Sequence, residues 1–254
     1  MDREEPMKPR VLVVEDDPVS RTFFLEVLSG LPAEVDAAAG CRGALACARV
    51  YAHALWLVDA HLPDGSAVDL LPRLRAAGGT ADVVAIAHTA SRDAGVHAAL
   101  LDAGFADVLA KPVGASCLLA TVGQRLRQRV REPRAAFLPA RVSSAASVGP
   151  APTGPWDDAA AMAALGDAGH VRALRALFAT ELPRVVAQLD VASQAGDAAG
   201  LRDLLHRLAS ACAFTGAHRL GEAVHRWQGD PADPVAMAAF RDAAARLLAS
   251  RSEL

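Results

Sequence analysis

Five short apolar runs alternate with segments of helical pattern in the first half of the chain, and this alternation constrains the fold more than any other feature. The runs lie at residues 11–14, 35–39, 55–58, 83–87 and 108–110. Four of them are apolar at every position, and the weaker run at 35–39 contains Asp36. Such runs are typical of strands that are buried on both faces. Short connections between strand and helix favour a parallel sheet with helices on both sides. We therefore predict an α/β fold with a doubly wound parallel five-stranded sheet.

Only helical patterns follow in the second half of the chain. We predict helices near residues 157–165, 170–193, 197–212, 219–227 and 234–250. Glycine and proline mark short turns between these segments, and short connections favour antiparallel neighbours. This half should form a separate all-α antiparallel helical bundle.

Between these two parts lies a stretch rich in proline, serine and glycine, which is a composition typical of a linker. We place the first domain at 8–130, the linker at 131–155 and the bundle at 156–254. The total of 254 residues is consistent with a two-domain division, since domains average roughly 150 residues.

Composition excludes several classes of protein. The net charge is -3, which argues against a broad basic surface for nucleic acid. No apolar run approaches the ~20 residues that a membrane span needs. The four cysteines form no CxxC pair and no zinc-ligand spacing, so we expect reduced thiols. We expect a soluble, cytoplasmic protein that neither inserts into membranes nor binds nucleic acid.

Several chemically active side chains follow the predicted strands directly. In an open parallel sheet, ligands bind outside the carboxyl ends of the strands, so these side chains should share one edge. They are Glu15, Asp16 and Asp17 after the first strand, Asp59 after the third, His88 and Thr89 after the fourth, and Lys111 after the fifth. Carboxylates held close together repel each other, and a hard divalent cation with oxygen ligands relieves that repulsion. Mg²⁺ suits one or two carboxylates completed by water and phosphate oxygens.

This set of groups is suited to phosphoryl chemistry. A carboxylate such as Asp59 can attack phosphorus and form an aspartyl phosphate. A metal ion and the Lys111 ammonium would offset the charge on the equatorial oxygens during transfer. A hydroxyl could hydrogen bond to the phosphoryl group afterwards.

The motifs VLVVEDDP, LWLVDAHLPDG, HTA and AKPV occur in this order, and with them segment 8–130 resembles the receiver domain of response regulators. The resemblance implies a flavodoxin-like fold with strand order 2-1-3-4-5. It also implies that Glu15 and Asp16 bind Mg²⁺ and that Asp59 is the phosphoacceptor and a metal ligand. The backbone carbonyl of His61 would be a further metal ligand.

By the same resemblance, Thr89 is the switch hydroxyl and Lys111 pairs with the phosphoryl group. One position departs from the family pattern. Val108 stands three residues before the lysine, where many receivers carry a tyrosine or phenylalanine that swings inward on activation. The departure puts the usual threonine–aromatic switch in doubt, but not phosphorylation itself.

A histidine stands out in the second half. The helix expected over 197–212 has an apolar stripe formed by Leu201, Leu205, Leu208 and Cys212. His206 lies off this stripe, with polar and small neighbours, so a partner surface should reach its imidazole. An imidazole can carry a phosphoryl group covalently.

The segment GDAAGLRDLLHRLASACAFTGAHRLGEAV resembles a histidine phosphotransfer (HPt) domain, with the resemblance covering roughly 156–254. It implies that His206 is the phosphotransfer histidine. That family usually has a lysine three residues after the histidine and a glycine four after, whereas this chain has Ala209 and Ser210.

The two resemblances together imply a two-component phosphorelay protein. Asp59 would accept a phosphoryl group from a sensor histidine kinase or an HPt protein, and His206 would exchange phosphoryl groups with a receiver aspartate, its own or that of a partner receiver domain. We expect no kinase activity, since the chain has no ATP-binding kinase motif.

One alternative stays open, and another is disfavoured. The bundle could have lost transfer chemistry and serve as a binding module controlled by phosphorylation of Asp59. An aspartate-based phosphatase is disfavoured because its Asp-x-Asp motif is missing after the third strand, where Ala60 and His61 follow Asp59.

Overall fold

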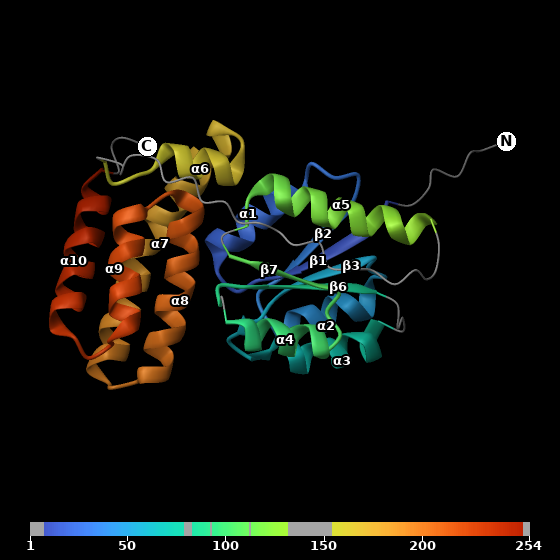
Figure 1. The fold of residues 1–254 in the computed structure, drawn as a ribbon, viewed down its shortest axis with the longest axis horizontal. Helices are drawn as coiled ribbons and strands as arrows, with labels where there is room; N and C mark the ends of the chain where they lie inside the picture. The colour runs from blue at the N-terminus through green and yellow to red at the C-terminus, as the bar shows by residue number, and fades with distance from the viewer. Residues whose placement is uncertain (1–7, 79–82, 92, 112, 132–153, 251–254) are drawn as a thin grey trace. The chain divides into compact units, whose positions relative to one another are not determined.

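The chain divides into two compact units, one on each side of residues 132–153 (Figure 1). The computed structural model describes residues 8–78, 83–91, 93–111, 113–131 and 154–250. The first unit contains a parallel sheet with its helices, and the described part of the second consists of helices. The linker expected at 131–155 lies almost wholly outside the described residues, so its boundaries stay predictions.

The first unit is built on a five-stranded sheet in which every pair of neighbouring strands is parallel. The strand order is β2-β1-β3-β6-β7, which confirms the predicted flavodoxin-like topology. The strands are β1 (Arg10–Val14), β2 (Glu34–Ala38), β3 (Leu55–Asp59), β6 (Val84–Thr89) and β7 (Asp107–Ala110). They lie within three residues of the runs that predicted them. The inner strands β1, β3 and β6 are buried almost throughout, as apolar runs predict, whereas the edge strands β2 and β7 are partly exposed.

Helices cover both faces of this sheet (Figure 1). One pair packs on one face, and three helices pack on the other against a core that includes Trp56 and Val58. The pair is α1 (Pro18–Leu28) and α5 (Ala115–Arg131), and the three are α2 (Cys41–Val50), α3 (Ala67–Gly78) and α4 (Ala94–Asp102). A small hairpin of β4 (His61–Leu62) and β5 (Gly65–Ser66) follows β3. Strands of two residues have no hydrophobic period, so the sequence did not predict this hairpin.

The first turn after β1 is fixed by a helix cap. Asp17 is the N-cap of α1, and its carboxylate accepts a hydrogen bond of 2.7 Å from the backbone N–H of Ser20. Pro18 occupies the first helical position, where its missing N–H is not needed. Because α1 begins directly after the acids that follow β1, Glu15 is held at the edge of the sheet.

The second unit is a helical bundle, as predicted. Its helices are α6 (Asp158–Leu165), α7 (Ala168–Gln194), α8 (Ala198–Thr215), α9 (His218–Gly229) and α10 (Pro234–Ala249). Successive long helices pack against each other, and α10 returns to contact α7. Phe178, Phe214, Trp227 and Phe240 are buried between them. Helix α8 continues three residues past its predicted end, because Phe214 extends the apolar stripe to the glycine that stops the helix.

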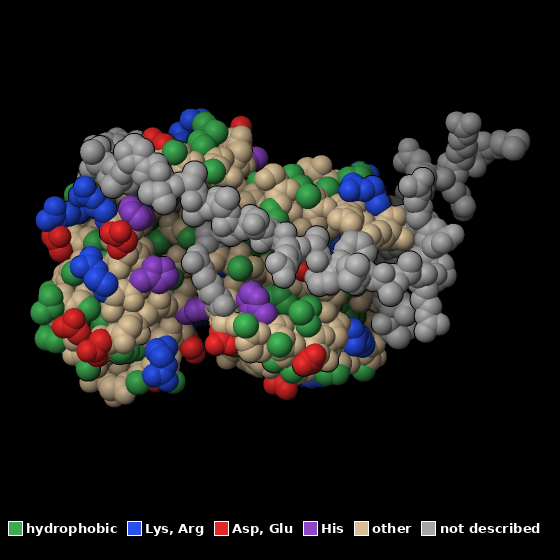
Figure 2. All heavy atoms as spheres, in the orientation of Figure 1, with side chains coloured by type: hydrophobic (Ala, Val, Ile, Leu, Met, Phe, Trp, Pro, Cys, Tyr) green, Lys and Arg blue, Asp and Glu red, His purple; other side chains and the backbone are tan. Residues whose placement is uncertain are grey.

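The surface of the bundle carries charges of both signs. Figure 2 shows basic and acidic side chains interspersed on the visible face of this unit. A groove of about 650 Å³ along α9 and α10 has the same mixed lining, with Arg219, Arg226 and Arg246 beside Glu222 and Asp242. A nucleic-acid interface would instead present a face of one sign. No helix in the described ranges is long and apolar enough to span a bilayer.

Gly216 ends α8 and ties the bundle to the start of α6. Its φ is 74°, in the left-handed region, and its carbonyl accepts a hydrogen bond of 2.7 Å from the Asp157 backbone N–H. A Cβ at this position would run into the Asp157 carbonyl oxygen. Gly196 has a similar φ of 66°, but a Cβ there would meet open space.

We predict that Gly216→Ala destabilises the bundle by about 3 kcal/mol, since it adds a backbone clash to the roughly 1–2 kcal/mol cost of a left-handed residue. Gly196→Ala should lower the free energy of unfolding only by the roughly 1–2 kcal/mol of a left-handed residue, because its Cβ meets no other atom. Urea unfolding followed by tryptophan fluorescence and circular dichroism measures both changes. Equal losses in the two variants would contradict the clash.

Candidate functional site

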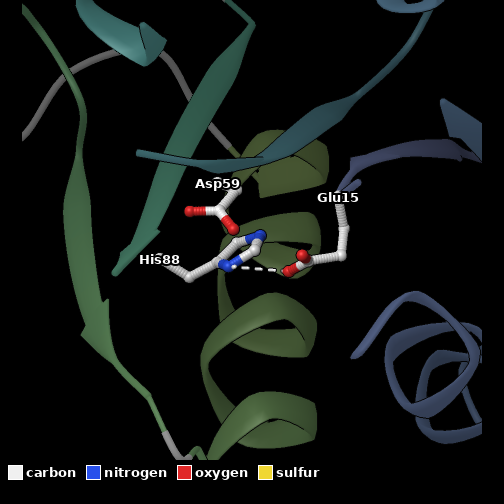
Figure 3. A group of neighbouring side chains, drawn as sticks. All are labelled: Glu15, Asp59 and His88. Atoms are coloured by element: carbon white, nitrogen blue, oxygen red, sulfur yellow. Dashed lines mark ion pairs between the residues drawn. The ribbon is translucent and has the colours of Figure 1, made fainter. Parts of the chain in front are cut away.

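Three polar side chains form one row across adjacent strands at the edge of the sheet. The parallel register pairs Val14 with Val58 and Asp59 with His88, so Glu15, one residue beyond Val14, continues the same row. Paired residues of neighbouring strands point to the same face of a sheet. Figure 3 shows Glu15, Asp59 and His88 converging, and their ligand atoms all lie within 4.8 Å of one another.

All three side chains of this row are buried. The exposed fraction is 0% for Glu15 and His88 and 3% for Asp59. Two buried carboxylates held this close together are costly unless a positive group compensates their charge.

Lys111 supplies that positive group from the residue after β7. Its Nζ donates to Oε2 of Glu15 at 2.7 Å and to Oδ2 of Asp59 at 2.5 Å. The Lys111 backbone N–H also donates to the Thr89 carbonyl at 2.7 Å, which holds the chain beside β6. A single buried ammonium is therefore shared between two carboxylates.

The protonation of this cluster follows from burial and pairing. Burial raises the pKa of Asp59, but attraction from Lys111 and hydrogen bonds outweigh it and hold the pKa at about 2. Burial, together with repulsion from the Asp59 and Asp17 carboxylates, raises the pKa of Glu15 well above its usual value, although attraction from Lys111 opposes this rise. Burial lowers the pKa of Lys111, but the two carboxylates raise it further than burial lowers it. Asp59 is thus ionised at neutral pH and carries a free lone pair.

The cluster fits a divalent cation on the chemistry of its donors. Two carboxylates face one ammonium, which leaves an excess of negative charge when both are ionised. Carboxylate oxygens are the ligands that hard divalent cations prefer. The acids Glu15 and Asp59 could therefore hold a metal ion, together with His88.

The turn after β3 orients the other oxygen of Asp59. Oδ1 accepts a hydrogen bond of 3.1 Å from the backbone N–H of His61, and the Ala60 N–H donates to the His88 carbonyl at 2.9 Å. The His61 side chain is exposed, so it does not join the cluster. The role expected for the His61 carbonyl stays a prediction.

Two expected site residues lie near the row without belonging to it. Thr89 follows His88 at the end of β6, is fully buried, and accepts a hydrogen bond of 3.1 Å from the Ser91 N–H. Asp16 is half-buried and is not one of the acids grouped within 4.8 Å. Their roles as switch hydroxyl and metal ligand stay predictions.

His88 is the member of the row to which the sequence assigned no role. Its ring packs against Phe24 of α1, with ring centroids 4.6 Å apart. Burial lowers the pKa of His88 to about 3, so the imidazole is neutral at ordinary pH. A polar residue inside the otherwise apolar run of β6, in register with Asp59, is the feature that could have identified it.

His206 lies in the other unit, on α8. The apolar stripe predicted beside it is correct, since Leu201, Leu205, Leu208 and Cys212 are all buried. His206 itself is half-buried, which is less open than the sequence led us to expect. Ala209 and Ser210 are buried, and the Ser210 hydroxyl donates to the His206 carbonyl at 3.4 Å.

Comparison with known families assigns each unit separately. Residues 11–123 match the model described as the response regulator receiver domain. Residues 173–250 match the model described as the Hpt domain. No curated protein matches the chain.

Similar solved structures cover the first half of the chain. A CheY-like receiver domain protein from Methanospirillum hungatei is 26% identical over 50% of this chain and 100% of its own, with a TM-score of 0.45. A protein described as a response regulator from Chloroflexus aurantiacus is 30% identical over 48% and 99%, with a TM-score of 0.44. The receiver domain of a sensor histidine kinase from Pseudomonas aeruginosa, which has a magnesium ion in its active site cleft, is 28% identical over 48% and 99%, with a TM-score of 0.44.

We predict that Lys111→Met lowers the free energy of unfolding at pH 7.5 by about 3–5 kcal/mol, because it leaves two buried carboxylates without a counter-charge. Without the ammonium, the pKa values of both carboxyls in the folded state should lie above their unfolded values of about 4. Such groups take up protons on folding, so the loss should shrink as the pH falls towards 5. Urea unfolding at several pH values, without divalent ions, measures this.

The matched control is Lys8→Met, because Lys8 is exposed and its loss removes the same charge from the surface. It should change the free energy of unfolding by less than about 0.5 kcal/mol. A Lys111 variant that behaves like this control would show that the buried ammonium is not needed.

Proposed function

The chain carries a response regulator receiver domain and an Hpt domain, and on this premise we propose that it is a phosphoryl carrier in a two-component phosphorelay. In the proposed first step, Asp59 accepts a phosphoryl group from a phosphohistidine of a sensor histidine kinase or an HPt protein. In the second, His206 exchanges phosphoryl groups with a receiver aspartate. With such partners, the protein would act in the cytoplasm.

One observation carries the proposal for the first unit: an ionised aspartate is held against a buried lysine at the edge of the sheet. Because the pKa of Asp59 is about 2, the carboxylate is a nucleophile at neutral pH without a general base. One carboxylate oxygen attacks phosphorus, an O–P bond forms, and the P–N bond to the donor imidazole breaks. The imidazole keeps the electron pair of that bond and takes a proton from solvent.

Lys111 would act throughout this transfer. Its ammonium lies 2.5 Å from Oδ2 of Asp59 and can follow the charge as it spreads onto the phosphoryl oxygens. The Thr89 hydroxyl at the end of β6 would hydrogen bond to the phosphoryl group once it is attached. Both roles use side chains that backbone hydrogen bonds already place at the edge of the sheet.

Mg²⁺ is the cation that we assign to this site. Glu15, Asp16 and Asp59 would hold it, with the His61 backbone carbonyl as a further ligand. When bound, it supplies a fixed positive charge that offsets the charge of the phosphoryl oxygens. The chain's own contribution is to gather the acids, keep Asp59 ionised and hold the Lys111 ammonium beside it.

The bundle would supply the second phosphoryl-carrying group. His206 lies outside the buried apolar stripe of α8, so its imidazole is the group that a partner receiver would approach. Arg202 and Arg207 are near it along the helix and could supply the positive charge that the family usually takes from a lysine.

A second function is favoured by the residues that follow His206. Ala209 offers no charge, and the Ser210 side chain is buried where the family usually has glycine. The half-buried state of His206 points the same way. On this alternative, the bundle binds a partner protein under the control of Asp59 phosphorylation and transfers no phosphoryl group.

We predict that Asp59→Asn reduces Mg²⁺-dependent phosphorylation of the receiver to background, since an amide is a poor nucleophile. Labelling of the full chain by a phosphorylated histidine kinase measures this. Asp64→Asn is the matched control, because Asp64 is an exposed acid that caps α2 through the N–H groups of Cys41 and Arg42. Full labelling of the Asp59 variant would mean that the acceptor is another residue.

The two functions of the bundle are separated by a second variant. We predict that the full chain incubated with a phosphorylated partner receiver acquires an acid-labile, base-stable label that His206→Gln removes. His225→Gln is the control, because His225 is an exposed histidine of α9. Absence of such a label with every partner receiver tested would favour the binding module.

A further inference from the structure

His88 is a fully buried histidine whose ring lies beside the two acids. Its ring interacts with the Val14 backbone, and no side chain forms a hydrogen bond with it among the described residues. Nδ1 lies 3.6 Å from Oε2 of Glu15, beyond hydrogen-bond distance (Figure 3). A buried imidazole grouped with two carboxylates in this way offers a nitrogen donor to any cation that they bind.

The surroundings of the ring hold it facing the acids. Phe24 packs against the ring at 4.6 Å, and the parallel register fixes His88 beside Asp59. One ligand atom from each of Glu15, Asp59 and His88 lies within 4.8 Å of the others. This spacing is close to the separation of up to about 4.4 Å between two donors that each lie roughly 2.0–2.2 Å from one ion.

The donor set differs from the one that Mg²⁺ prefers. Mg²⁺ is a hard ion that takes oxygen ligands. A neutral imidazole beside carboxylates suits Zn²⁺, Co²⁺ or Ni²⁺, and affinity for nitrogen-containing sites rises along the first transition row.

We propose that Glu15, Asp59 and His88 form a mixed nitrogen–oxygen site that binds a divalent transition-metal ion more tightly than Mg²⁺. The ion would compete with the Lys111 ammonium, which contacts carboxylates of the same set. The inference shares Asp59 with the proposed function, but it concerns metal binding and does not require phosphoryl transfer.

The test compares Co²⁺ with Mg²⁺ on the metal-stripped full chain by equilibrium dialysis. We expect Co²⁺ to bind at least about tenfold more tightly than Mg²⁺. His88→Gln should weaken Co²⁺ binding about tenfold or more, while Mg²⁺ binding changes by less than about twofold. Unchanged Co²⁺ affinity in His88→Gln would overturn the proposal, because the ion would then be held by other groups.

His53→Gln is the matched control. His53 is also a buried histidine beside a carboxylate, with Nε2 3.0 Å from Asp36, but it precedes β3, whereas Asp59 ends that strand. This variant should keep the wild-type preference for Co²⁺. Loss of the preference in both histidine variants would count against a specific role of His88.

A spectroscopic measurement identifies the ligand directly. With Mn²⁺ bound, pulsed electron paramagnetic resonance should detect coupling to an imidazole nitrogen in the wild type and in His53→Gln, and none in His88→Gln. His88→Leu, which fills the space beside Phe24, replaces the glutamine variant if circular dichroism shows that the latter does not fold. Coupling that persists without His88 overturns the proposal.

This outcome is separable from that of the proposed function. Phosphorylation of Asp59 is measured with Mg²⁺ and a phosphohistidine donor, in the absence of transition metals. If the chain is phosphorylated normally but shows no preference for Co²⁺, only the metal inference is overturned. If the chain binds Co²⁺ through His88 but acquires no phosphoryl label, only the proposed phosphorelay function is overturned.

Discussion

The buried ammonium of Lys111, shared between Glu15 and Asp59, is the interaction on which the first unit depends. Two carboxylates in a site closed to solvent would otherwise repel each other and favour their protonated forms. The ammonium keeps Asp59 ionised with a pKa of about 2, and this ionised form is the one that can react with phosphorus. The same hydrogen bonds link the ends of β1, β3 and β7. The ion pairs that keep Asp59 ionised therefore also hold these strand ends together.

The parallel register of the strands brings the side chains of the site together around the Lys111 ammonium. Because Asp59 pairs with His88 and Glu15 continues the same row, the three polar side chains project from the same face of the sheet and lie next to one another. An antiparallel arrangement would send the ends of neighbouring strands to opposite edges. The cap of α1 by Asp17 and the hydrogen bond from the Lys111 N–H to the Thr89 carbonyl fix the turns on either side of this row.

The bundle is stabilised in a different way from the first unit. Its helices are held together by the packing of aromatic and leucine side chains. A polar link between helices is made by Arg175, which donates to the Thr215 carbonyl at 2.9 Å and to Asp158 at 2.6 Å. These contacts join α6, α7 and α8.

The sequence by itself determined the element order, the two-part organisation, the sheet topology and the gathering of Glu15, Asp59 and Lys111 at one edge. It could do so because hydrophobic period separates strands from helices, and because parallel strands deliver their carboxyl ends to a common edge. Only the tertiary structure decided that His88 joins the acids while Asp16 stands outside the closest group, and that His206 is half-buried. Those outcomes depend on inter-strand register and on packing between distant segments, which no local pattern in the chain encodes.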